Sequence, residues 1–282
     1  MSYIESIISR RSVRTYSDRD ISAVDMKRIE EIIGKNKDTL FDSKIRFYLT
    51  ENSDDRRAEG IRYGTYGFIK NAKAFIAGVC VNNRKALIDF GFVLEKTVLD
   101  VEMMGISTCW LGGTFKRTDF VRKYVREKEE IIPCVISLGY EEDKRFGEKI
   151  IRSLSKADTR LPWGKLFYLD DFETPLIKAD AAELQKPLEM LRLAPSASNK
   201  QPWRVICTDG GDICHFYLEK TKGYSGNNMG FGIQYIDIGI ALSHFILSCN
   251  ELGISGGFFI TDPAPIIDSN REYMISWKKG VL

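Results

Sequence analysis

Two stretches of the sequence carry apolar residues around nearly the whole circumference of a helix. They cover residues 88–103 and 236–252. A helix without a polar face is buried on all sides, so the pattern predicts two central helices. Gly91 and Gly239 lie inside them, where glycine costs about 1 kcal/mol relative to alanine. Because both segments carry this cost, we expect the glycines to let the two helices approach closely.

The same two segments are related by a repeat of constant spacing. Matching residues lie 148 positions apart without a gap (237 − 89 = 148). This regularity favours an internal duplication over a chance similarity between two buried helices. The matches are Asp89, Gly91, Leu94, Leu99 and Gly105-Ile106-Ser107 in the first copy, and Asp237, Gly239, Leu242, Leu247 and Gly253-Ile254-Ser255 in the second.

The segments around these helices predict two similar α+β modules, residues 1–150 and 151–282, joined by the polar residues 141–158. In the first module a helix begins after the Ser22 cap and ends near Gly34. In the second, residues 209–211 (Asp-Gly-Gly) are a hairpin signal between two strands. The predicted strands are 44–50, 73–81 and 131–138 in the first module, and 203–208, 213–219, 256–261 and 273–277 in the second, where a helix is expected over 180–192.

The amino-acid composition excludes several classes of protein. The 282 residues are 44% hydrophobic and 28% charged, with a net charge of +2. These values are typical of a globular protein and too balanced for a nucleic-acid or membrane-surface binder that works by charge. No run approaches the roughly 18 apolar residues of a membrane span, and the N-terminus does not resemble a secretory signal. The six cysteines form no Cys-x-x-Cys pair, so we expect buried, reduced thiols in a cytoplasmic protein.

Several familiar catalytic patterns are excluded. Residues 253–257 match Gly-x-Ser-x-Gly, but a predicted helix precedes Ser255 and both histidines lie upstream of it. The hydrolase interpretation is therefore rejected. His215 falls in a predicted strand and His244 in a buried helix, where structural roles are expected. With two histidines and no cysteine pair, no metal site is expected.

The N-terminal segment contains basic residues with a regular spacing. In Arg10-Arg11-Ser12-Val13-Arg14, an extended backbone would point Arg10, Ser12 and Arg14 to one side, because side chains alternate along it. Two guanidinium groups and a hydroxyl aimed together would bind a phosphate group through charge-assisted, bidentate hydrogen bonds. The alternative interpretation is a solvated basic turn.

Two further segments have the composition of ligand-binding loops. In residues 193–203, two prolines fix the backbone, and Ser196, Asn199 and Gln201 supply neutral donors and acceptors. That set suits the recognition of a planar ring rich in C=O and N–H groups. In residues 108–115, Gly112 and Gly113 let the backbone come close to a ligand and expose its N–H groups.

Together, and in this order, the motifs resemble the FMN-dependent nitroreductase family, and more closely its duplicated single-chain branch, the TM nitroreductase type. The resemblance covers about residues 1–265, nearly the whole chain. It is carried by Arg10-Arg11-Ser12-Val13-Arg14, Cys109-Trp110-Leu111-Gly112-Gly113, Arg160-Leu161-Pro162-Trp163 and Ala194-Pro195-Ser196-Ala197-Ser198-Asn199-Lys200-Gln201-Pro202-Trp203.

The resemblance implies a nitroreductase-like α+β fold, in which the two degenerate modules form an intrachain pseudo-dimer around the central helices. Ordinary members of the family are homodimers with FMN at the subunit interface. Here the first module keeps the arginine motif but has residues 36–42 in place of the Pro-Ser-x-x-Asn-x-Gln-Pro loop, which only the second module keeps. The halves should therefore form one complete site with one FMN per chain, and a monomer becomes possible.

The resemblance also implies a role for each residue. Arg10, Arg11, Ser12, Arg14 and Arg160 would hold the phosphate and ribityl chain. The backbone N–H of Gly112 or Gly113 would point at flavin N5, and Trp110 and Leu111 belong to the same motif. Thr65 is expected to reach the ring or the ribityl chain, whereas residues 223–232 have no assigned counterpart. The isoalloxazine ring would be lined by Pro195, Ser196, Ala197, Asn199 and Gln201.

The implied chemistry is a two-step hydride transfer. NAD(P)H would reduce FMN at N5, and a nitroaromatic, a quinone or a similar small acceptor would then take its place. No side chain is needed as a general acid or base. Two alternatives stay open: a non-catalytic FMN-binding storage or sensor protein, and a reductive dehalogenase or flavin-modifying enzyme on the same scaffold.

Overall fold

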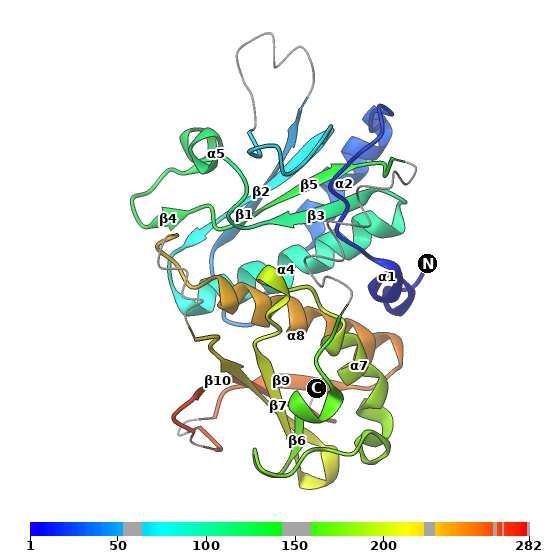
Figure 1. The fold of residues 1–282 in the computed structure, drawn as a ribbon, viewed down its shortest axis with the longest axis vertical. Helices are drawn as coiled ribbons and strands as arrows, with labels where there is room; N and C mark the ends of the chain where they lie inside the picture. The colour runs from blue at the N-terminus through cyan, green and yellow to red at the C-terminus, as the bar shows by residue number, and fades with distance from the viewer. Residues whose placement is uncertain (53–63, 143–158, 223–228, 262–263, 267, 281–282) are drawn as a thin grey trace.

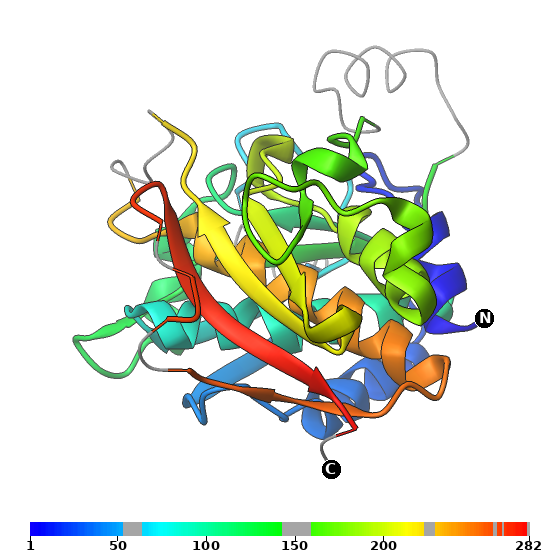
Figure 2. The same cartoon turned by 90° about the horizontal axis from the view of Figure 1, so that it is seen from below.

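The computed structural model arranges the chain around two long helices, α4 (Arg84–Met103) and α8 (Ile233–Glu251). One β-sheet lies on each side of this helix pair (Figures 1 and 2). The structure describes residues 1–52, 64–142, 159–222, 229–261, 264–266 and 268–280. Within these ranges no helix is both long and apolar enough to cross a membrane.

The first sheet is built from the N-terminal half of the chain. Its strands run in the order β1-β2-β5-β3 with antiparallel neighbours, and the short β4 pairs with β2. The elements of this half, besides α4, are α1 (Tyr3–Ser9), α2 (Ala23–Lys35), β1 (Ile45–Glu51), β2 (Ala74–Val81), β3 (Ser107–Leu111), α5 (Arg117–Tyr124), β4 (Glu130–Ile131) and β5 (Val135–Gly139).

The second sheet repeats the order of the four main strands, and its fifth strand, β6, pairs at a different place from β4. Its order is β6-β7-β8-β10-β9, so that β7, β8, β10 and β9 follow the pattern of β1, β2, β5 and β3, and β6 pairs in parallel at the edge. The elements of this half, besides α8, are η1 (Trp163–Lys165), β6 (Phe167–Leu169), η2 (Lys178–Leu184), α7 (Gln185–Arg192), η3 (Ala197–Asn199), β7 (Trp203–Thr208), η4 (Asp209–Gly211), β8 (Ile213–Glu219), β9 (Gly256–Phe259) and β10 (Arg271–Lys279).

The two central helices touch at their glycines, as the sequence predicts. A Cβ atom added to Gly91 would overlap the carbonyl oxygen of Ile236, and one added to Gly239 would overlap that of Ile88. The contact is reciprocal, because Ile88 and Ile236 are themselves 148 positions apart (236 − 88 = 148). Such a reciprocal contact is the kind that a twofold axis generates between two copies of one unit, which supports the duplication.

Two elements were predicted as continuous segments that the structure divides. The strand expected over 131–138 is interrupted at Pro133, which has no N–H group for a sheet. The carbonyl oxygens of Ile132 and Pro133 instead accept hydrogen bonds from Arg117. The helix expected over 180–192 is a 3₁₀ segment with a kink at Ala182, followed by α7. Pro187 explains the late start of α7, because proline fits only the first turn of a helix.

Other elements were not predicted. The short elements α1, α5, β3 and β6 are absent from the sequence-based description, whereas the strands and long helices expected elsewhere are present with shifted ends. The expected joint, residues 141–158, and therefore the boundary between the modules, lies mostly outside the described residues.

Both histidines form hydrogen bonds with residues inside the protein. His244 is fully buried, with Nε2 2.8 Å from Glu95 Oε1 and Nδ1 3.0 Å from the carbonyl oxygen of Met190. Trp110 Nε1 donates to the other oxygen of Glu95 at 2.7 Å, so this buried cluster ties α4, β3, α7 and α8 together. His215 lies between the hydroxyl groups of Thr208 and Ser276. All six cysteines are buried with free thiols.

Candidate functional site

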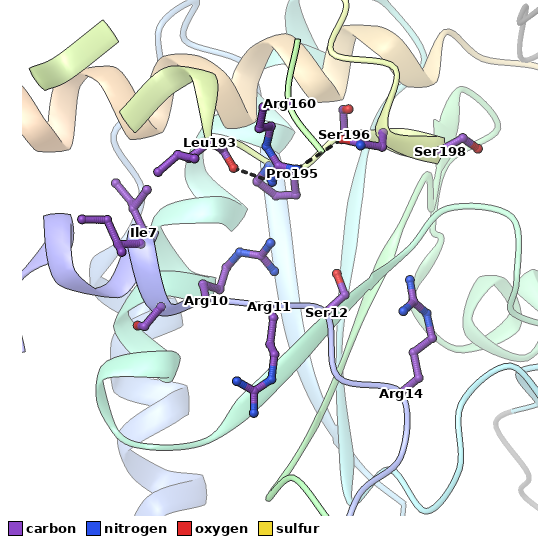
Figure 3. A pocket seen from close by; sticks show the side chains of 13 residues that line it. Ile7, Arg10, Arg11, Ser12, Arg14, Arg160, Leu193, Pro195, Ser196 and Ser198 are labelled. Atoms are coloured by element: carbon purple, nitrogen blue, oxygen red, sulfur yellow. Dashed lines mark hydrogen bonds between the residues drawn. The ribbon is translucent and has the colours of Figure 1, made fainter. Parts of the chain in front are cut away.

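A cavity of about 350 Å³ opens between the N-terminal segment and the loop that follows α7 (Figure 3). Residues from both halves of the chain line it, including Ser12 from one side and Asn199 from the other. No carboxylate is among these described lining residues. They are Ile7, Ile8, Ser9, Arg10, Arg11, Ser12 and Arg14 from the first half, and Arg160, Leu193, Pro195, Ser196, Ser198 and Asn199 from the second.

The arginine motif is extended, and its side chains alternate. Arg10, Ser12 and Arg14 point toward the opposite wall of the cavity, whereas the Arg11 guanidinium turns away (Figure 3). Arg11 forms an ion pair with Glu141, in which its Nε donates at 3.2 Å. The segment is held by a hydrogen bond from the backbone N–H of Val13 to the carbonyl oxygen of Thr108, at 3.0 Å.

Two of these guanidinium groups keep buried nitrogen atoms without a hydrogen-bond partner among the described residues. The atoms are Arg10 Nη1 and Arg14 Nε. A buried donor without an acceptor costs about 1–3 kcal/mol, and more when the group is charged. An anion between the two arginines would supply the missing acceptors through charge-assisted hydrogen bonds. The N-terminal wall of the cavity therefore fits a phosphate group.

A buried carboxyl group lies behind this wall. Glu102 accepts hydrogen bonds from the backbone N–H and the hydroxyl of Thr108, at 3.0 and 2.8 Å. Burial raises the pKa of Glu102 to about 6, while Arg10 and the Thr108 hydrogen bonds act in the opposite direction. Thr108 is also the residue whose carbonyl oxygen holds Val13, so this cluster supports the arginine segment from inside.

The opposite wall is organised by Arg160. Its Nη2 donates to the carbonyl oxygen of Leu193 at 2.9 Å, and its Nη1 donates to the carbonyl oxygen of Thr159 at 3.1 Å. Asn199 Nδ2 donates to the same Thr159 carbonyl at 2.9 Å. These bonds fasten the segment before η1 to the end of α7, and they bring a further arginine to the cavity from about 150 positions along the chain.

The loop of residues 195–202 is held in a strained conformation. Ser198, Asn199 and Gln201 have φ values of 49°, 54° and 50°, in a region that residues other than glycine seldom adopt. Gln201 is buried and stabilises the loop, because its Oε1 accepts from the Leu161 N–H at 2.8 Å and its Nε2 donates to the Asn199 carbonyl at 3.1 Å. Strain that the surrounding structure holds in place is typical of ligand-binding loops.

Ala197 connects this loop to the central helix α8. Its backbone N–H donates to Asp237 Oδ1 at 2.9 Å. Asp237 is fully buried, its Oδ2 has no hydrogen-bond partner among the described residues, and burial raises its pKa to about 7. The Asp237 carboxyl group therefore lies directly behind the loop that carries Ser196 and Ser198 to the cavity.

Seven of the expected site residues do not line this cavity: Thr65, Trp110, Leu111, Gly112, Gly113, Ala197 and Gln201. Leu111 is in the core and Trp110 binds Glu95. Gly112 lies against Ile233, where a Cβ would come within 2.5 Å of Ile233 Cδ1, and its carbonyl oxygen accepts from Arg117 Nη2 at 2.7 Å. Their roles toward a ligand stay predictions.

The Thr65 hydroxyl forms hydrogen bonds within its own turn, and its expected role toward a ligand stays a prediction. Its hydroxyl donates to the carbonyl oxygen of Ile69 at 3.1 Å and accepts from the N–H of the same residue at 3.3 Å. The side chain therefore closes a tight turn instead of presenting its hydroxyl to the cavity. Residues 223–228 of the unassigned segment lie outside the described residues.

Sequence reasoning missed the contribution of α1. Ile7, Ile8 and Ser9 line the cavity next to Arg10. The signal for this helix is present, because Ser2 and Glu5 form a capping box. Recognising it would have placed Arg10 at the C-terminal end of a helix and Ile7 and Ile8 beside the arginine motif.

Comparisons with known proteins agree with this architecture. The profile of the family described as "Putative TM nitroreductase" matches residues 2–249. A crystal structure from Thermotoga maritima, described as that of "a putative nitroreductase", aligns over 99% of this chain and 93% of its own chain, at 21% identity and a TM-score of 0.60. This likeness shows a shared fold.

Two further relatives match about half of the chain. A protein of Archaeoglobus fulgidus, described as "Putative NADH dehydrogenase/NAD(P)H nitroreductase", is 26% identical over 154 residues, which are 50% of this chain and 87% of the relative. A structure from Desulfovibrio desulfuricans, described as "a putative nitroreductase in complex with fmn", aligns over 52% of this chain and 94% of its own chain, at 18% identity and a TM-score of 0.40.

Proposed function

The chain belongs to the nitroreductase family described as "Putative TM nitroreductase", and from this membership we propose that it is an FMN-dependent oxidoreductase. It takes hydride from NAD(P)H and passes it to a small acceptor such as a nitroaromatic compound or a quinone. FMN is held between the two halves of the chain, with one FMN molecule for each chain.

One observation carries this proposal. The cavity has cationic donors on one wall, where Arg10 Nη1 and Arg14 Nε have no partner among the described residues. On the other wall, Ser196, Ser198 and Asn199 add neutral hydroxyl and amide groups beside Arg160. A ligand that fits both walls has an anionic end and a neutral polar part. FMN, with its phosphate and its isoalloxazine ring, is such a molecule.

The residues on the two walls of the cavity bind different parts of FMN. Arg10, Ser12 and Arg14 bind the phosphate end, and Arg160 adds a further positive charge from the opposite wall. The loop of residues 195–199 lines the ring. When bound, FMN supplies the hydride chemistry at N5, and the protein supplies position and electrostatics.

The segment of Gly112 and Gly113 is proposed to face N5 with a backbone N–H. Arg117 supports this segment, because it donates to the carbonyl oxygen of Gly112 at 2.7 Å and to that of Ile132 at 2.7 Å. An N–H aimed at N5 would stabilise charge that develops there. Burial lowers the pKa of Arg117.

The visible spectrum of the purified protein tests the proposal. A yellow protein that is bleached by NADH or NADPH without oxygen, and recovers its colour when a quinone or nitroaromatic compound is added, is expected. A yellow protein that neither nucleotide reduces would favour the non-catalytic storage or sensor function. A colourless protein that does not take up added FMN would refute the proposal.

A further inference from the structure

The turn of residues 64–69 is tied closely to the arginine segment. The N–H of Lys70 donates to the carbonyl oxygen of Arg14 at 2.8 Å, and the N–H of Tyr16 donates to the carbonyl oxygen of Lys70 at 3.1 Å. On its other side, the N–H of Lys116 donates to the carbonyl oxygen of Gly64 at 2.7 Å. The turn and the arginine segment therefore form one hydrogen-bonded unit.

The turn itself is rigid and strained. Besides the two Thr65 side-chain bonds, the N–H of Phe68 donates to the carbonyl oxygen of Thr65 at 2.8 Å. Tyr66 and Gly67 have φ values of 49° and 75°, and the first is costly for an aromatic residue. Ile69 is buried and anchors the turn in the core.

Phe68 is the side chain of this turn that touches the cavity wall. Its ring lies beside the Arg14 guanidinium, with the central carbon of that group 5.1 Å from the ring centroid. The distance is within the range of a cation–π interaction. Phe68 remains 40% exposed and belongs to none of the hydrophobic clusters among the described residues. Core packing therefore does not explain why an aromatic ring stands at this position.

A neighbouring aromatic ring would order the Arg14 side chain before a ligand binds. Its guanidinium lines the cavity, and its buried Nε has no hydrogen-bond partner among the described residues. An arginine side chain has many rotamers, and ordering one costs conformational entropy when a ligand binds. A ring that already packs against the guanidinium group orders the side chain in advance, so less conformational entropy is lost when the anion binds.

We propose that Phe68 is a positioning residue for the phosphate end of the ligand: its ring holds the Arg14 guanidinium toward the cavity. The inference rests on the proposed function, since it takes the phosphate of FMN as the group that Arg14 binds. Phe68 is not among the described residues that line the cavity, so we expect it to affect the affinity for the phosphate and to leave the affinity for the rest of the molecule unchanged.

Comparing FMN with riboflavin, which lacks the phosphate, tests this role. The dissociation constants of both ligands are measured by flavin fluorescence on the apoprotein and on Phe68→Ala, Phe68→Leu and Phe68→Tyr. Phe68→Ala should weaken FMN binding about two- to fivefold, the size of an exposed cation–π interaction, with no change for riboflavin. Phe68→Tyr should keep the affinity, while Phe68→Leu, which is apolar but has no ring, should behave like Phe68→Ala.

A double-mutant cycle with Arg14→Ala separates positioning from general damage. In the Arg14→Ala background, Phe68→Ala should have no further effect on FMN binding, because the two residues act through one interaction. An equal loss of FMN and riboflavin affinity in Phe68→Ala, or the same loss with and without Arg14, would overturn the proposal.

A second measurement keeps the inference independent of the flavin. Binding of inorganic phosphate to the wild type and to Phe68→Ala is followed by ³¹P NMR. Weaker phosphate binding in the variant supports the role of Phe68 even if neither flavin binds, in which case the proposed function alone fails. Absence of phosphate binding to the wild type, or equal binding to both proteins, contradicts the role of Phe68.

Discussion

Asp89 and Asp237 occupy matching positions on the two central helices, yet their carboxyl groups differ in the hydrogen bonds that they accept. Asp89 accepts hydrogen bonds from the backbone N–H groups of Leu40, Phe41 and Ser43, at 2.7 to 3.3 Å. Among the described residues, Asp237 accepts one hydrogen bond, from the backbone N–H of Ala197. The loop that faces the cavity therefore leaves its aspartate partly unpaired, whereas the corresponding loop of the first half does not.

Replacing Asp237 by asparagine should stabilise the protein, and more so at higher pH. Burial raises the pKa of Asp237 to about 7 in the folded protein, against about 3.9 when unfolded. The folded state thus holds the proton more tightly, and Asp237 lowers stability progressively as pH rises from about 4 to about 7. Asparagine keeps the acceptor for Ala197 and does not titrate. The gain, up to about 4 kcal/mol, is measured by urea denaturation at pH 5 and pH 8.

Asp89→Asn is the matched control for this prediction. Both Asp89 oxygens accept backbone N–H groups, so the amide nitrogen of asparagine would face a donor. We expect a loss of about 1–3 kcal/mol. A pH-independent loss of stability in Asp237→Asn would contradict the assignment of a costly buried carboxylate at that position.

Gly91→Ala should destabilise the protein by about 1–3 kcal/mol or more, because the added methyl group meets the backbone of Ile236, which cannot move aside like a side chain. Gly34→Ala is the control. Gly34 lies in α2, and an added Cβ would meet no described atom from outside its own helix within 4 Å, so helix propensity alone should raise stability by up to about 1 kcal/mol. Thermal or urea unfolding of both variants is compared. Equal effects would show that the helices do not touch at the glycine.

The double variant Arg10→Ala/Arg14→Ala should lose FMN. Each arginine offers a buried nitrogen without a hydrogen-bond partner in the part of the chain that the structure describes, and charge-assisted hydrogen bonds contribute about 1.5–3 kcal/mol each. We expect the dissociation constant of FMN to rise at least about 100-fold. Arg11→Ala removes a guanidinium that turns away from the cavity and pairs with Glu141, and it should change the dissociation constant less than about fivefold. Unchanged FMN content in the double variant would refute the phosphate site.

The flavin content should be one FMN for each chain. The complete set of motifs occurs once, with Arg10-Arg11-Ser12-Val13-Arg14 in the first half and the loop of residues 195–202 in the second. Protein reconstituted with excess FMN and freed of unbound flavin is denatured, and the released FMN is measured against protein concentration. A ratio of two would contradict the loss of the second site after duplication.

Local rules account for much of this protein. Alternation along an extended backbone predicts that Arg10, Ser12 and Arg14 share one side and Arg11 the other, and the structure has this arrangement. The apolar circumference of residues 88–103 and 236–252 predicts their burial, and the constant spacing of the repeat predicts that both glycines serve the same contact. These features can be predicted from neighbouring residues and from the spacing of the pattern along the chain.

Other features depend on contacts between distant residues. No local pattern brings Arg160 to the same cavity as Arg10, turns Arg11 toward Glu141 or stacks Phe68 beside Arg14. The Thr65 hydroxyl is used inside its own turn because the turn must satisfy its backbone, which the sequence does not reveal. Side-chain alternation and helix burial are set within a few residues, whereas the walls of a cavity are set by how whole sheets and helices pack. The sequence therefore determined which groups could bind an anion, and only the tertiary structure decided which of them meet.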